Sequence, residues 1–157
     1  MFLVTDTLEG RQKKVRSFLD KEPVIAVLLA AADFEWTTRR AILALGKSPT
    51  KSINARFLEE RRGGLKAFTK YWKDEVQSRP KLRKELKSIV LNWDVFVNKA
   101  YPLRHKLVHG AQGTTGVGYA TKAVEAFLAA SKEITIFALD NHEPIYGRCI
   151  RRINPRQ

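Results

Sequence analysis

The sequence predicts an all-α fold, and three observations lead to this expectation. Apolar residues recur at helical spacing through most of the chain. Prolines and glycines stand where helices would begin and end. No convincing alternation of apolar and polar residues, as strands show, occurs before the last residues. At 157 residues and 44% hydrophobic, the chain is long enough to bury a core, and we expect a single domain over residues 1–157, with a helical core at about 23–140.

Two helices are expected in the first third of the chain. Asp6 suits the cap of an N-terminal helix that reaches about Asp20. Pro23 suits the first turn of a second helix, and Gly46 stands just past its end. Apolar residues at helical spacing fill this second segment, which is the expected central helix: Val24, Val27, Leu28, Ala31, Phe34, Ala41, Ile42 and Leu45.

The middle of the chain predicts two short helices and one long one. Residues 53–62 and 65–76 are the expected short helices, separated by two glycines. After Ser78, apolar residues follow one another at intervals of 4, 3, 4, 3 and 4. This spacing predicts a single long helix with one apolar seam: Leu82, Leu86, Ile89, Trp93, Phe96 and Ala100.

Pro102 should break or kink that long helix, because its ring clashes with the carbonyl four residues back and it has no N–H to donate. A new short helix is expected after it, with Leu103 and Leu107 facing inward. A glycine-rich loop at residues 110–118 and a final helix at about 119–139 follow. The last residues, 141–157, are expected to form an extended basic arm.

Charge is the second informative feature of the sequence. The formal net charge is +13, and residues 36–73 hold ten basic side chains against two acidic ones, whereas residues 95–124 hold no acidic residue. Most charge runs are solvated surface. An excess this one-sided favours a polyanion partner, because each phosphate contact releases counterions. We therefore expect a nucleic acid, with an acidic protein as the second candidate.

Within this basic segment we select the side chains most suited to contact RNA. They are Arg61, Arg62, Lys66 and Lys70. Trp36, Trp72 and Trp93 are expected in the core. Trp72 and Tyr71 lie among these cations, and the alternative for them is stacking against the bases of a single strand.

The sequence predicts a cytoplasmic protein without a membrane partner. Its longest apolar run, residues 24–32, is shorter than the roughly 20 residues that span a bilayer. Residues 1–6 lack the charged lead and the apolar stretch of a secretory signal. The single Cys149 cannot form an internal disulfide, which fits a reducing compartment and excludes a zinc site built from cysteines.

Residues 103–110 concentrate the groups suited to acid/base chemistry. Two of the three histidines and Arg104 fall within six positions. Histidine exchanges a proton near neutral pH, since its unperturbed pKa is about 6.5, and arginine carries a permanent charge that matches phosphate geometry. A phosphodiester is therefore the first substrate to consider.

Three alternatives to a catalytic site stay open. The basic and histidine side chains can simply form the polar face of an amphipathic helix. His105 and His109, four residues apart, can bind zinc, but a third ligand would have to come from His142 or a remote carboxylate. The glycine-rich loop offers a phosphate cradle, yet it lacks the Gly-Lys-Ser/Thr ending of a P-loop. We expect neither a metal nor a cofactor.

Arg104 and His109 have four residues between them, and His105 occupies the position after the arginine. This order resembles the motif of the HEPN superfamily (higher eukaryotes and prokaryotes nucleotide-binding domains), although asparagine or aspartate is commoner after the arginine. The long helix, kink, motif helix and final helix resemble that family's up-and-down helical bundle. The resemblance implies an endoribonuclease of toxin–antitoxin or phage-defence systems, acting as a homodimer whose two motifs meet in one cleft, with a cognate antitoxin or regulatory protein as a partner.

The chemistry can be argued from the residues themselves. RNA carries its own nucleophile, the 2′-hydroxyl, so cleavage needs a proton acceptor, a proton donor and charge stabilisation. His109 would be the acid or base, and Arg104 would bind the scissile phosphate. His105 would orient the phosphate or carry the second proton, and Lys106 would contact flanking backbone. On an ideal helix Arg104 and His109 are about 500° apart in rotation, so a second subunit is one way to unite them.

Two acids interrupt the expected central helix. Asp33 and Glu35 either mark its emergence into solvent, with Glu35 paired to Arg39, or orient Arg104 or His109 across the bundle. The competing functional hypothesis is a non-catalytic module that binds nucleic acid or protein through its basic face. The joint presence of Arg104, His105 and His109 favours catalysis, since a binder needs only positive charge.

Overall fold

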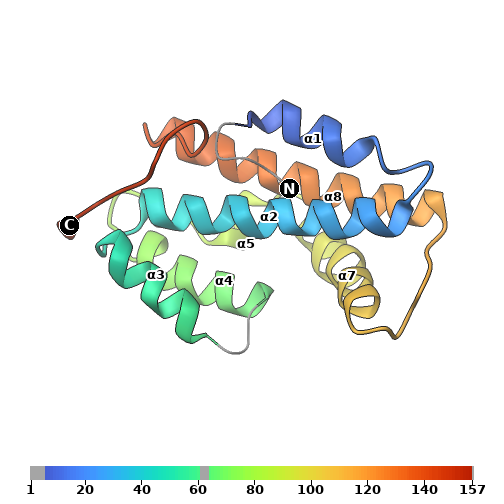
Figure 1. The fold of residues 1–157 in the computed structure, drawn as a ribbon. Coiled ribbons are helices and arrows are strands. Elements are labelled where there is room, and N and C mark those ends of the chain that lie inside the picture. The colour runs from blue at the N-terminus through green and yellow to red at the C-terminus, as the bar shows by residue number, and fades with distance from the viewer. Residues whose placement is uncertain (1–5, 61–63, 157) are drawn as a thin grey trace.

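The computed structural model describes residues 6–60 and 64–156, and all regular elements in these ranges are helices (Figure 1). The expected all-α bundle is confirmed. Two long helices, α2 (Pro23–Leu45) and α8 (Val117–Asp140), form its centre; they lie side by side and run in the same direction. Helix α1 (Leu8–Arg16) runs back along one side of this pair.

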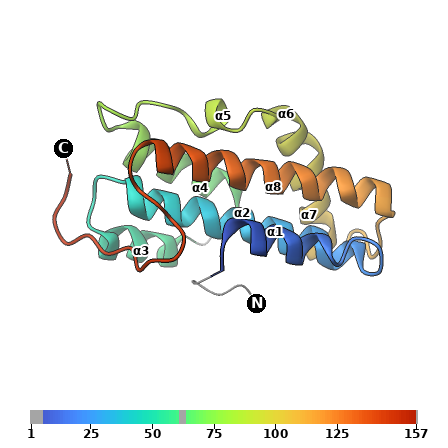
Figure 2. The ribbon, with the colours of Figure 1, turned by 90° about the horizontal axis from the view of Figure 1, so that it is seen from above.

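The chain between α2 and α8 forms short elements around the central pair (Figure 2). They are α3 (Thr50–Glu59), α4 (Leu65–Trp72), the π-helical turn η1 (Lys73–Gln77), α5 (Leu86–Ile89), α6 (Trp93–Val95), a second π-helical turn η2 (Phe96–Ala100) and α7 (Tyr101–Val108). The last three are continuous, so residues 93–108 form one helical run with a π turn inside it.

Helix α2 begins and ends where the sequence predicted. Pro23 occupies its first turn, and Gly46 is its C-cap, with the Gly46 amide donating to the Ile42 carbonyl at 2.9 Å. A Cβ atom on residue 46 would lie 2.5 Å from that carbonyl oxygen. Glycine is therefore required for the chain to leave the helix at this point.

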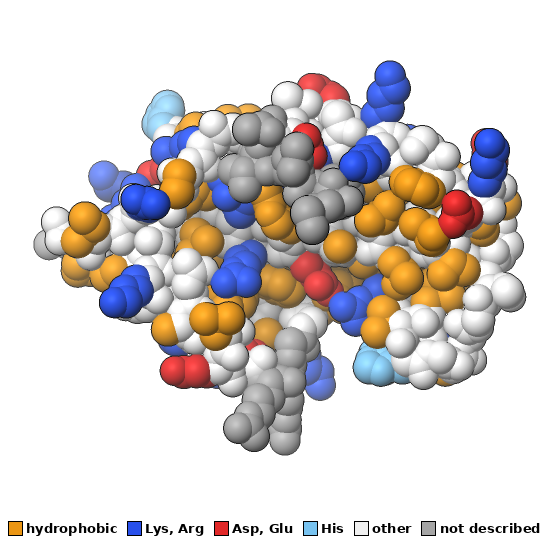
Figure 3. Space-filling view, in the orientation of Figure 1, with side chains coloured by type: hydrophobic (Ala, Val, Ile, Leu, Met, Phe, Trp, Pro, Cys, Tyr) orange, Lys and Arg blue, Asp and Glu red, His pale blue; other side chains and the backbone are white. Residues whose placement is uncertain are grey.

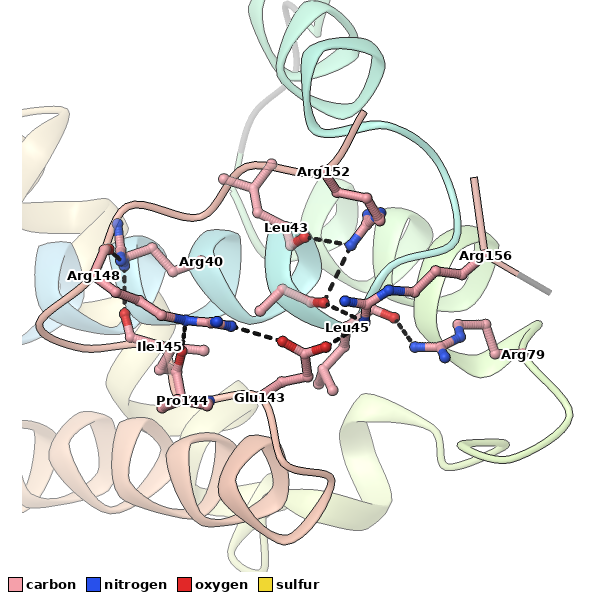
Figure 4. Close-up of polar contacts among 11 residues, drawn as sticks. Arg40, Leu43, Leu45, Arg79, Glu143, Pro144, Ile145, Arg148, Arg152 and Arg156 are labelled. Carbon is pink, nitrogen blue, oxygen red and sulfur yellow. Dashed lines mark hydrogen bonds and ion pairs between the residues drawn. The ribbon is translucent and has the colours of Figure 1, made fainter. Parts of the chain in front are cut away.

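Residues 141–157, the expected basic arm, fold back over the C-terminal end of α2 as far as the structure describes them (Figure 4). Arg152 donates to the carbonyls of Leu43 at 2.9 Å and Ala44 at 3.2 Å, and Arg156 donates to Ala44 at 3.1 Å. Arg79 donates to the next carbonyl, that of Leu45, at 2.5 Å. These cations satisfy carbonyls that have no partner within the helix and lie at the negative end of its dipole.

The core is built around aromatic rings from three parts of the chain. Phe34 of α2, Phe96 of η2 and Phe127 of α8 are fully buried, with ring centroids 4.6 Å apart for Phe34–Phe96 and 5.3 Å for Phe96–Phe127. Trp72 and Tyr71 are also buried, so neither is available to stack on RNA bases. The expected place of Trp72 in the core is confirmed.

Asp33 does not emerge into solvent. Its side chain is fully buried and accepts a hydrogen bond from Arg11 of α1 at 2.6 Å. The Arg11 guanidinium lies 3.8 Å from the centre of the half-buried Trp36 ring. Asp33 therefore ties α1 to α2, and its predicted role beside Arg104 or His109 is wrong.

Two expected helices are shorter than predicted. Helix α1 is capped by Thr7 rather than Asp6, with Thr7 Oγ1 accepting from the Gly10 amide at 3.1 Å, and it ends at Arg16. The long helix expected after Ser78 is not present: only α5 and the run from Trp93 are helical. The predicted seam is nevertheless buried apart from the half-buried Trp93.

Tertiary hydrogen bonds explain why that seam is not one helix. Trp72 Nε1 donates to the Lys84 carbonyl at 2.9 Å, and the Leu91 amide donates to Glu133 of α8 at 3.0 Å. Side chains from other helices thus take backbone groups that a continuous helix would pair internally. Pro102 does not break the run either: the π turn η2 ends two positions before it and carries the chain into α7.

Candidate active-site groove

An open groove of about 1460 Å³ runs between two helical walls. One wall is the run α6–η2–α7 and the other is α4 with the start of η1. In Figure 3 this face of the molecule is hollowed between them, and a histidine side chain stands beside the hollow. We refer to this feature as the groove.

All three residues of the predicted catalytic motif line the groove. Arg104, His105 and His109 come from α7 and its C-cap, and the two imidazole rings have centroids 4.3 Å apart. Leu103, buried, and Leu107, half-buried, face the core as predicted. A single chain therefore brings the arginine and both histidines to one cavity, and a second subunit is not needed to unite them.

The π turn before α7 helps to align this wall. Residues at intervals of four drift by about 40° per step around an α-helix. A wider π turn rotates less per residue and offsets this drift. As a result Trp93, Val97, Tyr101, His105 and His109, each four residues after the last, all line the groove. Pro102, the second residue of α7, stands two positions after the end of the turn.

Glu35 of α2, which also lines the groove, fixes the arginine. Its carboxylate lies 3.2 Å from Arg104 Nη2 and accepts a hydrogen bond from the Tyr101 hydroxyl at 2.9 Å. Burial raises the pKa of Tyr101, and the neighbouring Glu35 raises it further, so the phenol stays protonated and donates. Of the two predicted supporting acids, Glu35 reaches the motif. It does so instead of pairing with Arg39, which donates to Asn54 at 2.9 Å.

The other wall carries a row of lysines. Lys66, Lys70 and Lys73 are exposed and line the groove, with Asp74 as the acid on that side. The predicted contacts Lys66 and Lys70 thus face the motif. Lys106 is exposed on α7 but is not part of the lining. Arg61 and Arg62, also predicted, lie outside the described residues.

Several cations of the basic segment have structural partners instead. Arg56 forms an ion pair with the buried Glu75. Arg40 donates to the carbonyls of Ile145 at 2.6 Å and Arg148 at 2.5 Å, within the folded-back C-terminal residues. Part of the charge excess in residues 36–73 therefore holds the fold together, and among the described residues of this segment the lysines of α4 and η1 face the groove.

No cluster of three or more His, Cys, Asp or Glu side chains that could hold a metal ion occurs in residues 6–60 and 64–156. Within the same ranges, no helix is both long enough and apolar enough to cross a membrane. Cys149 is exposed and unpaired with another cysteine.

Sequence reasoning did not select Lys73, Trp93, Val97 or Tyr101 as site residues, yet they line the groove. Trp93 had been expected in the core because it belongs to the apolar seam. The seam did not indicate that part of its ring is exposed to the groove. An interval of four links residues 93 to 109 in the sequence, but it marks one helix face only where a π turn offsets the drift of an α-helix, and no sequence signal predicted that turn.

Comparisons with protein-family models, with curated proteins and with solved structures found no match to this chain. The candidate site therefore rests on its own geometry and chemistry.

Proposed function

We propose that this protein is a metal-independent endoribonuclease that cleaves single-stranded RNA in the groove. The observation that carries the proposal is the convergence of Arg104, His105 and His109 on one cavity, with Arg104 oriented by Glu35 and lysines on the facing wall. An arginine beside two adjacent imidazoles supplies the groups that phosphodiester transesterification needs.

In the proposed reaction, one imidazole accepts the proton of the RNA 2′-hydroxyl as its oxygen attacks the adjacent phosphorus. The bond from phosphorus to the 5′-oxygen breaks, and the second imidazole donates a proton to that departing oxygen. The products are a 2′,3′-cyclic phosphate and a 5′-hydroxyl end. Arg104 binds the phosphate and the negative charge that develops on it. His109 and His105, with rings 4.3 Å apart, are the two proton carriers.

The test is incubation of the purified protein with RNA in excess EDTA. We expect cleavage that leaves 2′,3′-cyclic phosphate, or the 3′-phosphate derived from it, and no cleavage of an all-2′-deoxy strand. Arg104→Ala/His109→Ala should remove most activity without unfolding the protein. His142→Ala is the matched control, because His142 is exposed and does not line the groove. A strict requirement for zinc or magnesium, or cleavage of the all-deoxy strand, would refute the mechanism.

The competing hypothesis is a non-catalytic module that binds nucleic acid in the same groove. The lysine row of α4 and η1 favours it equally, since binding needs only that charge. Intact RNA that is bound but never cut, over hours and across pH 5–9, would select this alternative.

The HEPN-like order of Arg104, His105 and His109 also suggests a role for the protein in the cell. On that resemblance we propose a cytoplasmic toxin or defence effector, active as a homodimer and restrained by a cognate antitoxin or regulatory protein. Expression that arrests growth and degrades cellular RNA, with neither effect for Arg104→Ala/His109→Ala, would support that role.

A further inference from the structure

We infer that the Trp93 end of the groove is a base-stacking subsite for an unpaired nucleotide a few positions from the scissile phosphate. The inference rests on the proposed function for the identity of the scissile site, but the binding it describes can be measured without cleavage. It assigns to Trp93, Val97 and Lys73 a role in holding single-stranded RNA.

The first observation is the chemical division of the groove along its length. Arg104, His105 and His109 occupy one end of the α6–η2–α7 wall, and Trp93 and Val97 occupy the other. Trp93 packs on Phe96, with ring centroids 5.6 Å apart, and is only half-buried. An indole that is fixed on one side by a core ring and open to the groove on the other suits base stacking, which every base can make.

The second observation is the row of cations opposite that indole. Lys66, Lys70 and Lys73 follow one another at intervals of four and three on a single helical face, and all three are exposed to the groove. Such a row can follow the phosphates of one strand while the bases turn toward the other wall. A duplex would leave its bases paired and unable to reach Trp93, so the occupant we infer is single-stranded.

Helical geometry limits the length of that strand. Eleven residues separate Trp93 from Arg104, which corresponds to about 16 Å along a helix axis. Successive nucleotides of one stacked strand rise about 3.4 Å, so at most about five nucleotides separate the stacked base from the scissile phosphate. A dinucleotide substrate would reach the catalytic groups but not Trp93, whereas a longer strand would reach both.

The direct test is a titration of the full chain with an all-2′-O-methyl octanucleotide, whose blocked 2′-oxygens prevent the proposed cleavage. Stacking should quench tryptophan fluorescence, and Trp93→Phe should remove the quenching while binding, followed by anisotropy of a labelled strand, stays within about threefold. Trp93→Leu keeps apolar bulk without a π-face and should weaken binding about tenfold. Val95→Ala on the same run, outside the groove lining, is the control for folding and should change neither signal.

The contribution of the lysine row to binding is measured separately, by the dependence of affinity on salt. Lys66→Gln/Lys70→Gln/Lys73→Gln should lower the slope of log affinity against log salt by about 2, since each lost phosphate contact to a single strand contributes about 0.7. Lys13→Gln/Lys122→Gln/Lys132→Gln is charge-matched and changes exposed lysines of α1 and α8 outside the groove lining, so its slope should stay at the wild-type value.

Substrate length links the subsite to turnover. Trp93→Leu should raise KM about tenfold for an octanucleotide RNA, leave its kcat within twofold, and leave cleavage of a dinucleotide unchanged. Equal losses on both substrates, or undiminished octanucleotide binding by Trp93→Leu, would overturn the inference. So would a polyglutamate peptide that displaces the strand and binds wild type and Trp93→Leu equally, because the groove would then be an acidic-protein site.

The two proposals fail in different ways. If no RNA is cut but the octanucleotide quenches Trp93, the ribonuclease proposal is wrong and the strand-binding groove stands. If RNA is cut but Trp93 variants behave as wild type on every length of substrate, the subsite is wrong and the ribonuclease stands.

Discussion

Glu35 of α2 and Arg104 of α7 form an ion pair at 3.2 Å in the lining of the groove, although 69 positions separate them in the chain. Both side chains are about a quarter exposed, at 26% and 24%. The same carboxylate accepts the Tyr101 hydroxyl bond. Glu35 thus holds the guanidinium in place while leaving it accessible from the groove, so we regard it as a positioning residue.

Glu35→Gln should lower kcat on RNA by about ten- to a hundredfold, because a misplaced phosphate-binding group costs about this much. KM should change less than kcat, and the melting temperature should fall only slightly, since the site is partly exposed. Tyr101→Phe, which removes the hydroxyl bond but keeps the ion pair, is the matched comparison and should lose less activity. Steady-state kinetics on one RNA substrate decides the point, and a normal kcat for Glu35→Gln would contradict it.

The buried Arg11–Asp33 pair predicts a large effect on stability. Asp33→Asn should reduce the free energy of unfolding by about 3–5 kcal/mol, because it removes the carboxylate that compensates the charge of Arg11 in the core. Arg11→Met/Asp33→Leu removes both charges and should recover much of that loss. Urea unfolding measures all three proteins; a double variant less stable than Asp33→Asn would mean that the pair is a net stabilising interaction.

The C-terminal residues that cap α2 also predict a stability effect. Arg152→Ala should destabilise the protein by about 1–3 kcal/mol, since it removes charge-assisted bonds to the carbonyls of Leu43, Ala44 and Ser48. Arg151→Ala, at an exposed neighbour, should stay within about 0.5 kcal/mol of wild type. Thermal or urea unfolding distinguishes the two. Equal effects would show that charge in this segment, and not the capping geometry, determines stability.

We expect the contribution of Glu75 to the free energy of unfolding to be lost in acid. Its burial disfavours the charged form, but hydrogen bonds from Ser48 and the ion pair with Arg56 outweigh this and lower the pKa of Glu75. A lowered folded-state pKa stabilises the protein above the ordinary value of 4.5, and this contribution is lost as pH falls through the folded-state pKa. The stability difference between wild type and Glu75→Gln should therefore narrow below about pH 4.5. A difference that is constant from pH 7 to pH 3 would contradict it.

Subunit mixing addresses whether one chain carries a complete site. Because Arg104, His105 and His109 line one groove of a single chain, excess Arg104→Ala/His109→Ala protein should leave activity proportional to the wild-type chain present. The homodimer stays a prediction from the resemblance, so subunit exchange must be verified with labelled chains. Strong inhibition by the inactive chain would instead place the site between two subunits.

The sequence alone determined the helical class, the limits of α2 and the motif itself. Spacing identified the buried positions because helical burial repeats every three to four residues, and Pro23 and Gly46 act locally on the backbone. The motif was visible because Arg104, His105 and His109 are close in sequence. Local rules also placed Leu103 and Leu107 toward the core, as the structure has them.

Only the tertiary structure decided which distant groups meet. Asp33 and Glu35 are two residues apart on one helix, yet Asp33 is buried against Arg11 and Glu35 faces Arg104, because opposite sides of α2 contact different helices. The apolar positions after Ser78 face the core as predicted, but they do not lie on one helix, because Trp72 and Glu133 form hydrogen bonds with backbone groups of this segment. The groove itself exists because the π turn aligns residues 93–109 opposite the lysines of α4 and η1, and neither condition can be read from spacing within one segment.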